Sequence, residues 1–123
     1  MIYYLEASDL DMNNKILLPG LLPENKDKIF VVMVKAEWCG HCKTATPKFE
    51  EAAKNMENNP NAMYCIADVT TEPELSDKTK FFDDFRGFPH FSAFKNGVEI
   101  KGALDKAGGK RDVQTFMNMG MGK

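Results

Sequence analysis

The sequence predicts an α/β fold in which a central mixed β-sheet is flanked by helices on both faces. Apolar runs typical of buried strands alternate along the chain with segments of helical periodicity, and a hairpin pattern follows them. Strands separated by helices pair in parallel, whereas a hairpin adds antiparallel strands, so the predicted sheet is mixed. The 123 residues suit a single domain over residues 1–123.

The first half of the chain predicts one strand followed by one helix. Residues 1–28 are the least regular part, with a short strand or helix before a loop rich in proline. Lys28–Ala36 is a β-branched run that fits a strand buried on both faces. Cys39–Asn59 repeats apolar residues at helical spacing. Within it, Pro47 removes the hydrogen bond to the carbonyl of Lys43, which predicts a kink.

The next two segments repeat this alternation. Ala62–Val69 is a second apolar run and predicts another buried strand. Thr70–Phe85 predicts a helix, because acidic residues occupy its first turn and leucine and phenylalanine share one face. Thr71 is the expected N-cap of this helix, since a threonine hydroxyl can accept a hydrogen bond from a free amide at a helix start.

The last part of the chain predicts a hairpin and a closing helix. Phe88–Gly102 alternates in the manner of two paired strands, with Asn96 and Gly97 between them. This dipeptide favours a type I′ turn, whose two central residues both need positive φ. Asp112–Met119 is the expected closing helix.

Composition and charge exclude several classes of protein. The chain is 43% hydrophobic and 28% charged, as in ordinary globular proteins, and its net charge is −2. No basic stripe appears, so we expect no nucleic-acid partner. No apolar run approaches the roughly 18 residues of a membrane span, so we expect no membrane partner. We also expect a monomer.

The ends of the sequence bear on localisation. The N-terminal residues lack the basic and apolar regions of a signal peptide, and the C-terminal residues are not an ER-retention signal. A cytoplasmic protein is therefore expected. A viral origin would suit an oxidising protein in the cytoplasm, and a fragment of a longer ER protein is the alternative.

The stretch KAEWCGHCK, Lys35–Lys43, carries the most chemistry. The chain has three cysteines, Cys39, Cys42 and Cys65, an odd number that does not suit a disulfide framework. Cys39 begins the predicted helix, where free amides and the helix dipole favour a thiolate. Cys42 lies one turn further and should be less exposed. We therefore expect Cys39 to attack a disulfide and Cys42 to resolve the product.

The two residues between these cysteines should tune the pair. Gly40 is expected to let the chain turn tightly, and His41 to stabilise the Cys39 thiolate when it is cationic. A structural disulfide, a zinc site completed by Cys65 and a histidine, and an inert pair of core cysteines are the alternatives. Cys65, in mid-strand, is expected to be a small buried hydrophobe. No metal and no cofactor are expected.

The motifs AEWCGHCK and RGFPHF together resemble the thioredoxin superfamily, and the CGHC core resembles the catalytic domains of protein disulfide isomerase. The resemblance covers about Ile29–Met119 and includes Pro47 in the active-site helix and the FKNG hairpin turn. It implies the thioredoxin fold. It also implies a cis peptide bond between Phe88 and Pro89, placed against Cys39.

The resemblance further implies which residues meet a substrate. Trp38, Phe88, Pro89 and His90 should border an extended protein segment, and exposed backbone groups beside the cis-proline should pair with that segment. His90 stands where the family usually has threonine. It is either an ionisable ring near Cys39 or a partly exposed strand residue without a role. Arg111 matches an arginine that can approach the second cysteine, with a solvated charge as the alternative.

One feature departs from the family. The family buries an acid six residues before the first cysteine and, in isomerase domains, pairs it with a lysine on the next strand. Here the matching positions hold Met33 and Ile66. The acid is thought to take the proton of the resolving cysteine. We therefore expect slower turnover or another base, with Glu37 and the histidines as candidates.

These observations predict a thiol–disulfide oxidoreductase that acts on protein cysteines and disulfides together with an unidentified redox partner. The CGHC core favours an oxidising protein, and the expected cytoplasmic location favours a reducing one. Two other classes stay open. One is a peptide-binding module of the same fold with weak or vestigial redox activity, and the other is a metal or iron–sulfur protein.

Overall fold

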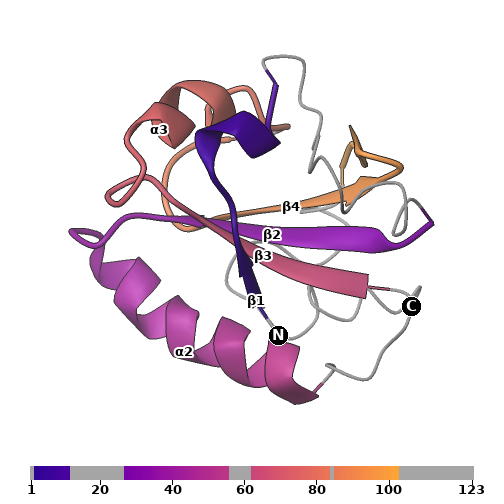
Figure 1. The fold of residues 1–123 in the computed structure, drawn as a ribbon. Helices are drawn as coiled ribbons and strands as arrows, with labels where there is room; N and C mark the ends of the chain where they lie inside the picture. The colour runs from indigo at the N-terminus through magenta and orange to yellow at the C-terminus, as the bar shows by residue number, and fades with distance from the viewer. Residues whose placement is uncertain (1, 12–26, 56–61, 84, 103–123) are drawn as a thin grey trace.

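A computed structural model describes residues 2–11, 27–55, 62–83 and 85–102 (Figure 1). Its strands form one five-stranded sheet in the order β1-β3-β2-β4-β5. The elements are β1 (Ile2–Tyr4), the 3₁₀ helix η1 (Ala7–Asp9), β2 (Ile29–Lys35), α2 (Gly40–Asn55), β3 (Ala62–Asp68), α3 (Glu74–Thr79), β4 (His90–Lys95) and β5 (Val98–Glu99).

The pairing of the strands confirms the predicted mixed sheet. β1 and β2 both run parallel to β3, which lies between them. β4 pairs antiparallel with β2, and β5 pairs antiparallel with β4. The helix α2 connects β2 to β3 as a crossover, which makes this pair parallel, whereas a tight turn connects β4 to β5. The strand–helix–strand order predicted from the sequence therefore gives the parallel pair, and the predicted hairpin gives the antiparallel pair.

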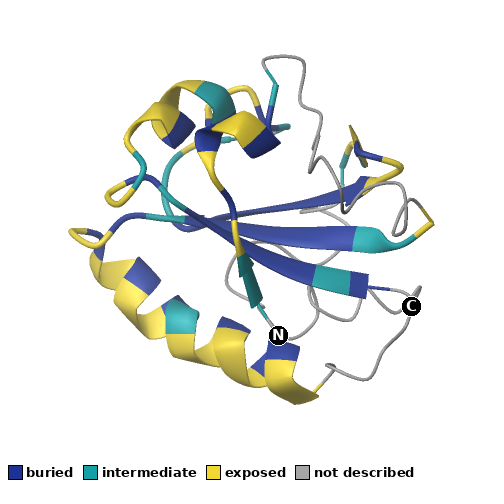
Figure 2. Cartoon of the chain, viewed as in Figure 1, coloured by how far each residue is buried: buried dark blue, intermediate teal, exposed yellow. Residues whose placement is uncertain are grey.

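Helices cover both faces of the sheet, and each face has its own core (Figure 1). On one face, Phe49 of α2 belongs to the same buried cluster as Val31 and Met33 of β2. On the other face, Leu75 of α3 belongs to the cluster that contains Val32. The middle of β2 is buried throughout, as Figure 2 shows, because neighbours cover it on both sides. This is the reason for its continuous apolar sequence.

The predicted helix Thr70–Phe85 is wrong in length and in its cap. The observed α3 spans only Glu74–Thr79, and Pro73 takes the N-cap position. Proline suits the start of a helix because it has no amide hydrogen to leave unpaired. The amide and hydroxyl of Thr71 instead bond to the Asp68 carboxylate. After Thr79 the chain continues in tighter turns, in which amides bond three residues back.

The hairpin turn is confirmed. Asn96 has φ 54° and Gly97 has φ 77°, as a type I′ turn requires. Pro47 lies inside α2, as expected. The predicted closing helix Asp112–Met119 lies outside the described residues.

Candidate active site

Cys39 sits between the start of α2 and the loop that leads into β4. The amide of Cys42 donates a hydrogen bond to the Cys39 sulfur over 3.2 Å. The Cys39 thiol donates to the carbonyl oxygen of Phe88 over 3.4 Å. This sulfur is thus held by a first-turn amide of α2, the kind of donor that stabilises a thiolate. Cys39 is 8% exposed, less than its expected role as attacking thiol suggested.

The peptide bond between Phe88 and Pro89 is cis, as the resemblance implied. Pro89 is buried, and Phe88 is half-buried. The hydrogen bond from the Cys39 thiol ends on the carbonyl of this same bond. The loop before β4 and the start of α2, which are 49 residues apart in sequence, therefore meet at one sulfur atom.

Cys42 is more deeply buried than Cys39, as predicted, with 1% of its surface exposed. Burial raises the pKa of the Cys42 thiol to about 12, and the hydrogen bond with Cys39 adds to this effect. The backbone of Ala36 and the charge of Lys35 act in the opposite direction and lower this pKa. Cys42 is therefore a protonated thiol at neutral pH, and it must ionise before it can attack a disulfide.

The residues between the cysteines are the first two of α2. Gly40 is the first residue of α2, and its φ is not among the positive values found at Gly87, Gly97 and Gly102. A Cβ built on Gly40 meets no atom within 4 Å. Neither backbone conformation nor space therefore requires glycine at this position, and its influence on the cysteine pair stays a prediction. His41 is exposed on the first turn of α2, and its influence on Cys39 stays a prediction.

Aromatic rings continue from the cysteines along the loop before β4. Trp38 is 71% exposed, and its ring meets the edge of the Phe88 ring at 5.4 Å between centroids. Phe85 contacts both Phe88 and His90, at 5.6 and 5.1 Å between centroids. His90 is buried, with its Nε2 2.9 Å from the Ser92 hydroxyl oxygen. The expectation of a partly exposed His90 is wrong, because aromatic rings enclose its side chain.

The positions of the missing acid and lysine are apolar and adjacent. Met33 of β2 and Ile66 of β3 are direct partners in the sheet register, and both are fully buried. Lys35 and Asp68 are the register partners two residues further along the same strands. Their Nζ and Oδ2 atoms lie 3.9 Å apart. This ion pair was missed from the sequence, although period-two alternation already places it on the same sheet face as Met33 and Ile66.

A hollow of about 460 Å³ lies beside this ion pair and Cys42. Among the described residues, no group of three or more histidine, cysteine and acidic side chains gathers to hold a metal ion. The residues that line the hollow are Lys35, Ala36, Glu37, Cys42, Lys43, Thr46 and Pro47.

The remaining candidates lie outside this site or outside the described residues. Cys65 is fully buried in β3 as a free thiol, which confirms its interpretation as a small buried hydrophobe. Burial raises the pKa of the Cys65 thiol. Arg111 falls in the range 103–123, which the structure does not describe.

The fold and the site together define a class of protein, an α/β domain that carries a CXXC pair at the start of a helix and against a cis-proline. The thioredoxin family model matches residues 22–119, and the chain belongs to this family. The first thioredoxin domain of mouse protein disulfide-isomerase A4 has the same fold. It superposes with a TM-score of 0.65 at 20% identity, over 97% of this chain and 72% of that one.

Two relatives show the range of proteins that this chain resembles. A thioredoxin-like protein of Invertebrate iridescent virus 6 is 30% identical over 98% of this chain and 93% of its own length. Protein disulfide isomerase-like 1-1 of Arabidopsis thaliana is 32% identical over 73% of this chain. That match spans 17% of the plant protein, so the chain corresponds to a small part of it. No helix in the described ranges is long and apolar enough to cross a membrane.

Proposed function

We propose that this chain is a thiol–disulfide oxidoreductase that acts on protein cysteines and disulfides. The observation that carries the proposal is the hydrogen bond from the Cys42 amide to the Cys39 sulfur at the start of α2. A sulfur that accepts an amide hydrogen bond at a helix start is stabilised as the thiolate, the nucleophile of disulfide exchange. The family membership and the CXXC pair support the same chemistry.

The reaction balances within the chain and its substrate. The Cys39 thiolate attacks one sulfur of a substrate disulfide, and the other substrate sulfur leaves as a thiolate. Cys42 then loses its proton and attacks the Cys39 sulfur of the mixed disulfide. The Cys39–Cys42 disulfide forms, the second substrate thiolate leaves, and two electrons have passed from the chain to the substrate. Run in reverse, the same steps oxidise a substrate dithiol, and neither direction needs a metal or an organic cofactor.

The surface around Cys39 supports a protein segment as substrate. Trp38 offers an exposed indole, and Phe88 and Pro89 turn the backbone next to the sulfur. Backbone groups beside this bend can pair with an extended chain of almost any sequence. His90 contributes through its backbone, because its ring is buried.

The viral relative bears on the setting in which the chain works. The match to a protein of Invertebrate iridescent virus 6 covers nearly the whole of both chains. It supports the interpretation of a virus-encoded protein, and we propose that this protein acts in the cytoplasm. The CGHC core then favours the oxidation of dithiols there, because an amide hydrogen bond to the Cys39 sulfur is a contact that favours the reduced pair and so makes it more oxidising.

Insulin reduction tests the proposal. The wild-type chain is expected to reduce insulin with dithiothreitol as electron donor, and Cys39→Ser is expected to abolish this activity. Cys42→Ser should instead accumulate a mixed disulfide with the substrate, which non-reducing gel electrophoresis detects. Wild-type activity no higher than that of Cys39→Ser would refute the proposal.

A peptide-binding module of the same fold is the second candidate. The apolar pair Met33 and Ile66 favours it, because no acid lies there to accept the proton of a resolving cysteine. If the chain is such a module, the wild-type protein and Cys39→Ser should bind an unfolded protein with equal affinity. Neither of the two should reduce insulin.

A further inference from the structure

Cys42 must lose its proton before it can resolve a mixed disulfide, and the groups around Cys42 determine how easily it does so. Cys42 is buried, so its thiolate is disfavoured by the loss of water around it. The positions where the family holds its buried acid and lysine carry Met33 and Ile66, which have no charge and are fully buried. A cation near Cys42 would favour the thiolate that attacks the mixed disulfide.

Lys35 supplies such a cation. It lines the same hollow of about 460 Å³ as Cys42, and its charge is among the influences that favour the Cys42 thiolate. The hollow is large enough for several water molecules, at about 30 Å³ each. It thus gives the proton of Cys42 a route to solvent.

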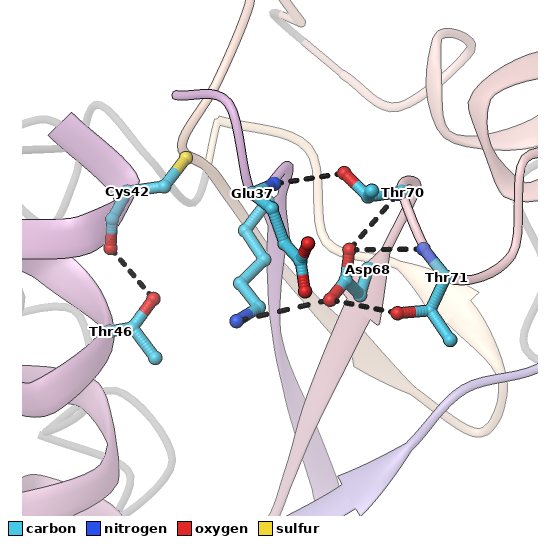
Figure 3. A network of polar contacts seen from close by, with 7 residues as sticks. Glu37, Cys42, Thr46, Asp68, Thr70 and Thr71 are labelled. Carbon is cyan, nitrogen blue, oxygen red and sulfur yellow. Dashed lines mark hydrogen bonds and ion pairs between the residues drawn. The ribbon is translucent and has the colours of Figure 1, made fainter. Parts of the chain in front are cut away.

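Asp68 holds Lys35 in this position. The two side chains are 19% and 12% exposed, so their ion pair is shielded from water on most sides. The Asp68 carboxylate also accepts hydrogen bonds from the amides of Thr70 and Thr71 and from the Thr71 hydroxyl, as Figure 3 shows. These hydrogen bonds fix the orientation of the carboxylate. We therefore give it a role in orienting Lys35.

We propose that Lys35, oriented by Asp68, is a positioning residue that stabilises the thiolate of Cys42 while Cys42 resolves the mixed disulfide. The inference rests on the proposed oxidoreductase function and adds a residue to it. In this step the Cys42 thiol gives its proton to water in the hollow, the Cys42–Cys39 bond forms, and the bond from Cys39 to the substrate sulfur breaks. The substrate leaves as a thiolate, and no further oxidant is involved.

Other charges face the same hollow and set the background for any pH dependence. Glu37 lies on the loop before α2, and Lys43 lies on the first turn of α2. Asp68 faces Lys35 from β3, and Cys39 contacts Cys42 directly. Replacing Lys35 also removes the partner of the Asp68 carboxylate, so the single variant Lys35→Met is compared with the double variant Lys35→Met/Asp68→Asn to isolate the charge of Lys35.

The experiment separates the attack of Cys39 from the resolution by Cys42. Reduced protein is mixed rapidly with 5,5′-dithiobis(2-nitrobenzoic acid), whose coloured thiolate leaves once when Cys39 attacks and again when Cys42 resolves. In Lys35→Met we expect the second release to slow about tenfold at neutral pH, the order of effect of one nearby charge in a medium between protein and water. The first release should change less than twofold.

The conservative and control variants sharpen the result. Lys35→Arg keeps the charge and should restore most of the rate of the second release. Lys54→Met removes an exposed lysine at the other end of α2 and should match the wild type in both releases. The pH profile of the second release should move up by about one pH unit in Lys35→Met, because the lost cation favoured the thiolate.

A variant that unfolds does not leave the inference untested. Lys35→Met/Asp68→Asn removes both charges and so leaves no unpaired carboxylate, and it should show the same slow second release. A second release at the wild-type rate in a folded Lys35 variant overturns the inference, and so does equal slowing of both releases. In those cases the two wild-type releases still support the oxidoreductase. If the wild type gives no release at all, the proposed function fails as well.

Discussion

At the residue scale, the two cysteines of the CGHC segment have different surroundings. Cys39 accepts an amide hydrogen bond and donates to the Phe88 carbonyl, whereas Cys42 is enclosed and has a pKa raised to about 12 by burial. Only Cys39 has a first-turn amide of α2 directed at its sulfur, whereas burial keeps Cys42 a thiol. This difference supports the assignment of Cys39 as the attacking residue.

Trp38 gives a prediction at this scale. Trp38→Ala should raise the KM for a protein substrate about tenfold and leave kcat and thermal stability nearly unchanged, because exposed aromatic side chains at a binding site contribute mainly to affinity. Insulin reduction at varied insulin concentration measures this split.

Tyr4→Ala is the matched control for Trp38→Ala, since Tyr4 is an exposed aromatic residue on the edge strand β1. Equal effects of the two substitutions on KM, or a fall in the stability of Trp38→Ala, would contradict a role of Trp38 in substrate binding.

At the scale of elements, backbone conformation explains which glycines matter. Gly97 has φ 77° in the turn between β4 and β5, a value that side chains disfavour, whereas Gly40 opens α2 without a positive φ. Gly40 lies in the CGHC motif, but it is the turn at Gly97 whose backbone conformation requires glycine.

Gly97→Ala should therefore lower the free energy of unfolding by about 1 kcal/mol, because alanine is strained at positive φ. Gly40→Ala should leave it unchanged or raise it by up to about 1 kcal/mol, since alanine favours a helix and its Cβ meets open space. Urea unfolding of both variants measures the difference. A larger loss in Gly40→Ala than in Gly97→Ala would refute this assignment.

At the scale of the whole molecule, buried thiols link stability to pH. Burial raises the pKa of both Cys42 and Cys65 above the ordinary cysteine value of 9.0. The folded protein therefore holds these two protons more tightly than the unfolded chain does. The associated stability is complete below about pH 9 and is lost as the pH rises towards the folded-state pKa values.

We accordingly predict that the free energy of unfolding of the reduced protein falls between pH 9 and pH 11. Each buried thiol contributes about 1.4 kcal/mol per pH unit to this fall. Urea unfolding under reducing conditions at several pH values measures the slope. Cys65→Ala should show a shallower slope, whatever its stability at neutral pH. An identical slope in wild type and Cys65→Ala would contradict the prediction.

The fold was predictable because it depends on local patterns. Short stretches of sequence favour their own local structure. This holds for the β-branched run of β2, the helical spacing of α2 and the Asn96–Gly97 turn. The helix α3 was predicted too long. Its apolar spacing continues to Phe82 and Phe85, but after Thr79 the chain turns more tightly, and Phe82 reaches the core without a helix.

The sequence by itself determined the CXXC cysteine pair and the mixed sheet, since these follow from the local order of residues and elements along the chain. The cis bond before Pro89 was implied by the resemblance to the family, and the structure confirms it. Tertiary structure alone decided what surrounds the two sulfurs. The Phe88 carbonyl reaches Cys39, aromatic rings bury His90, and Lys35 meets Asp68 beside Cys42. The physical reason is that burial and charge act through space, between segments that folding brings together.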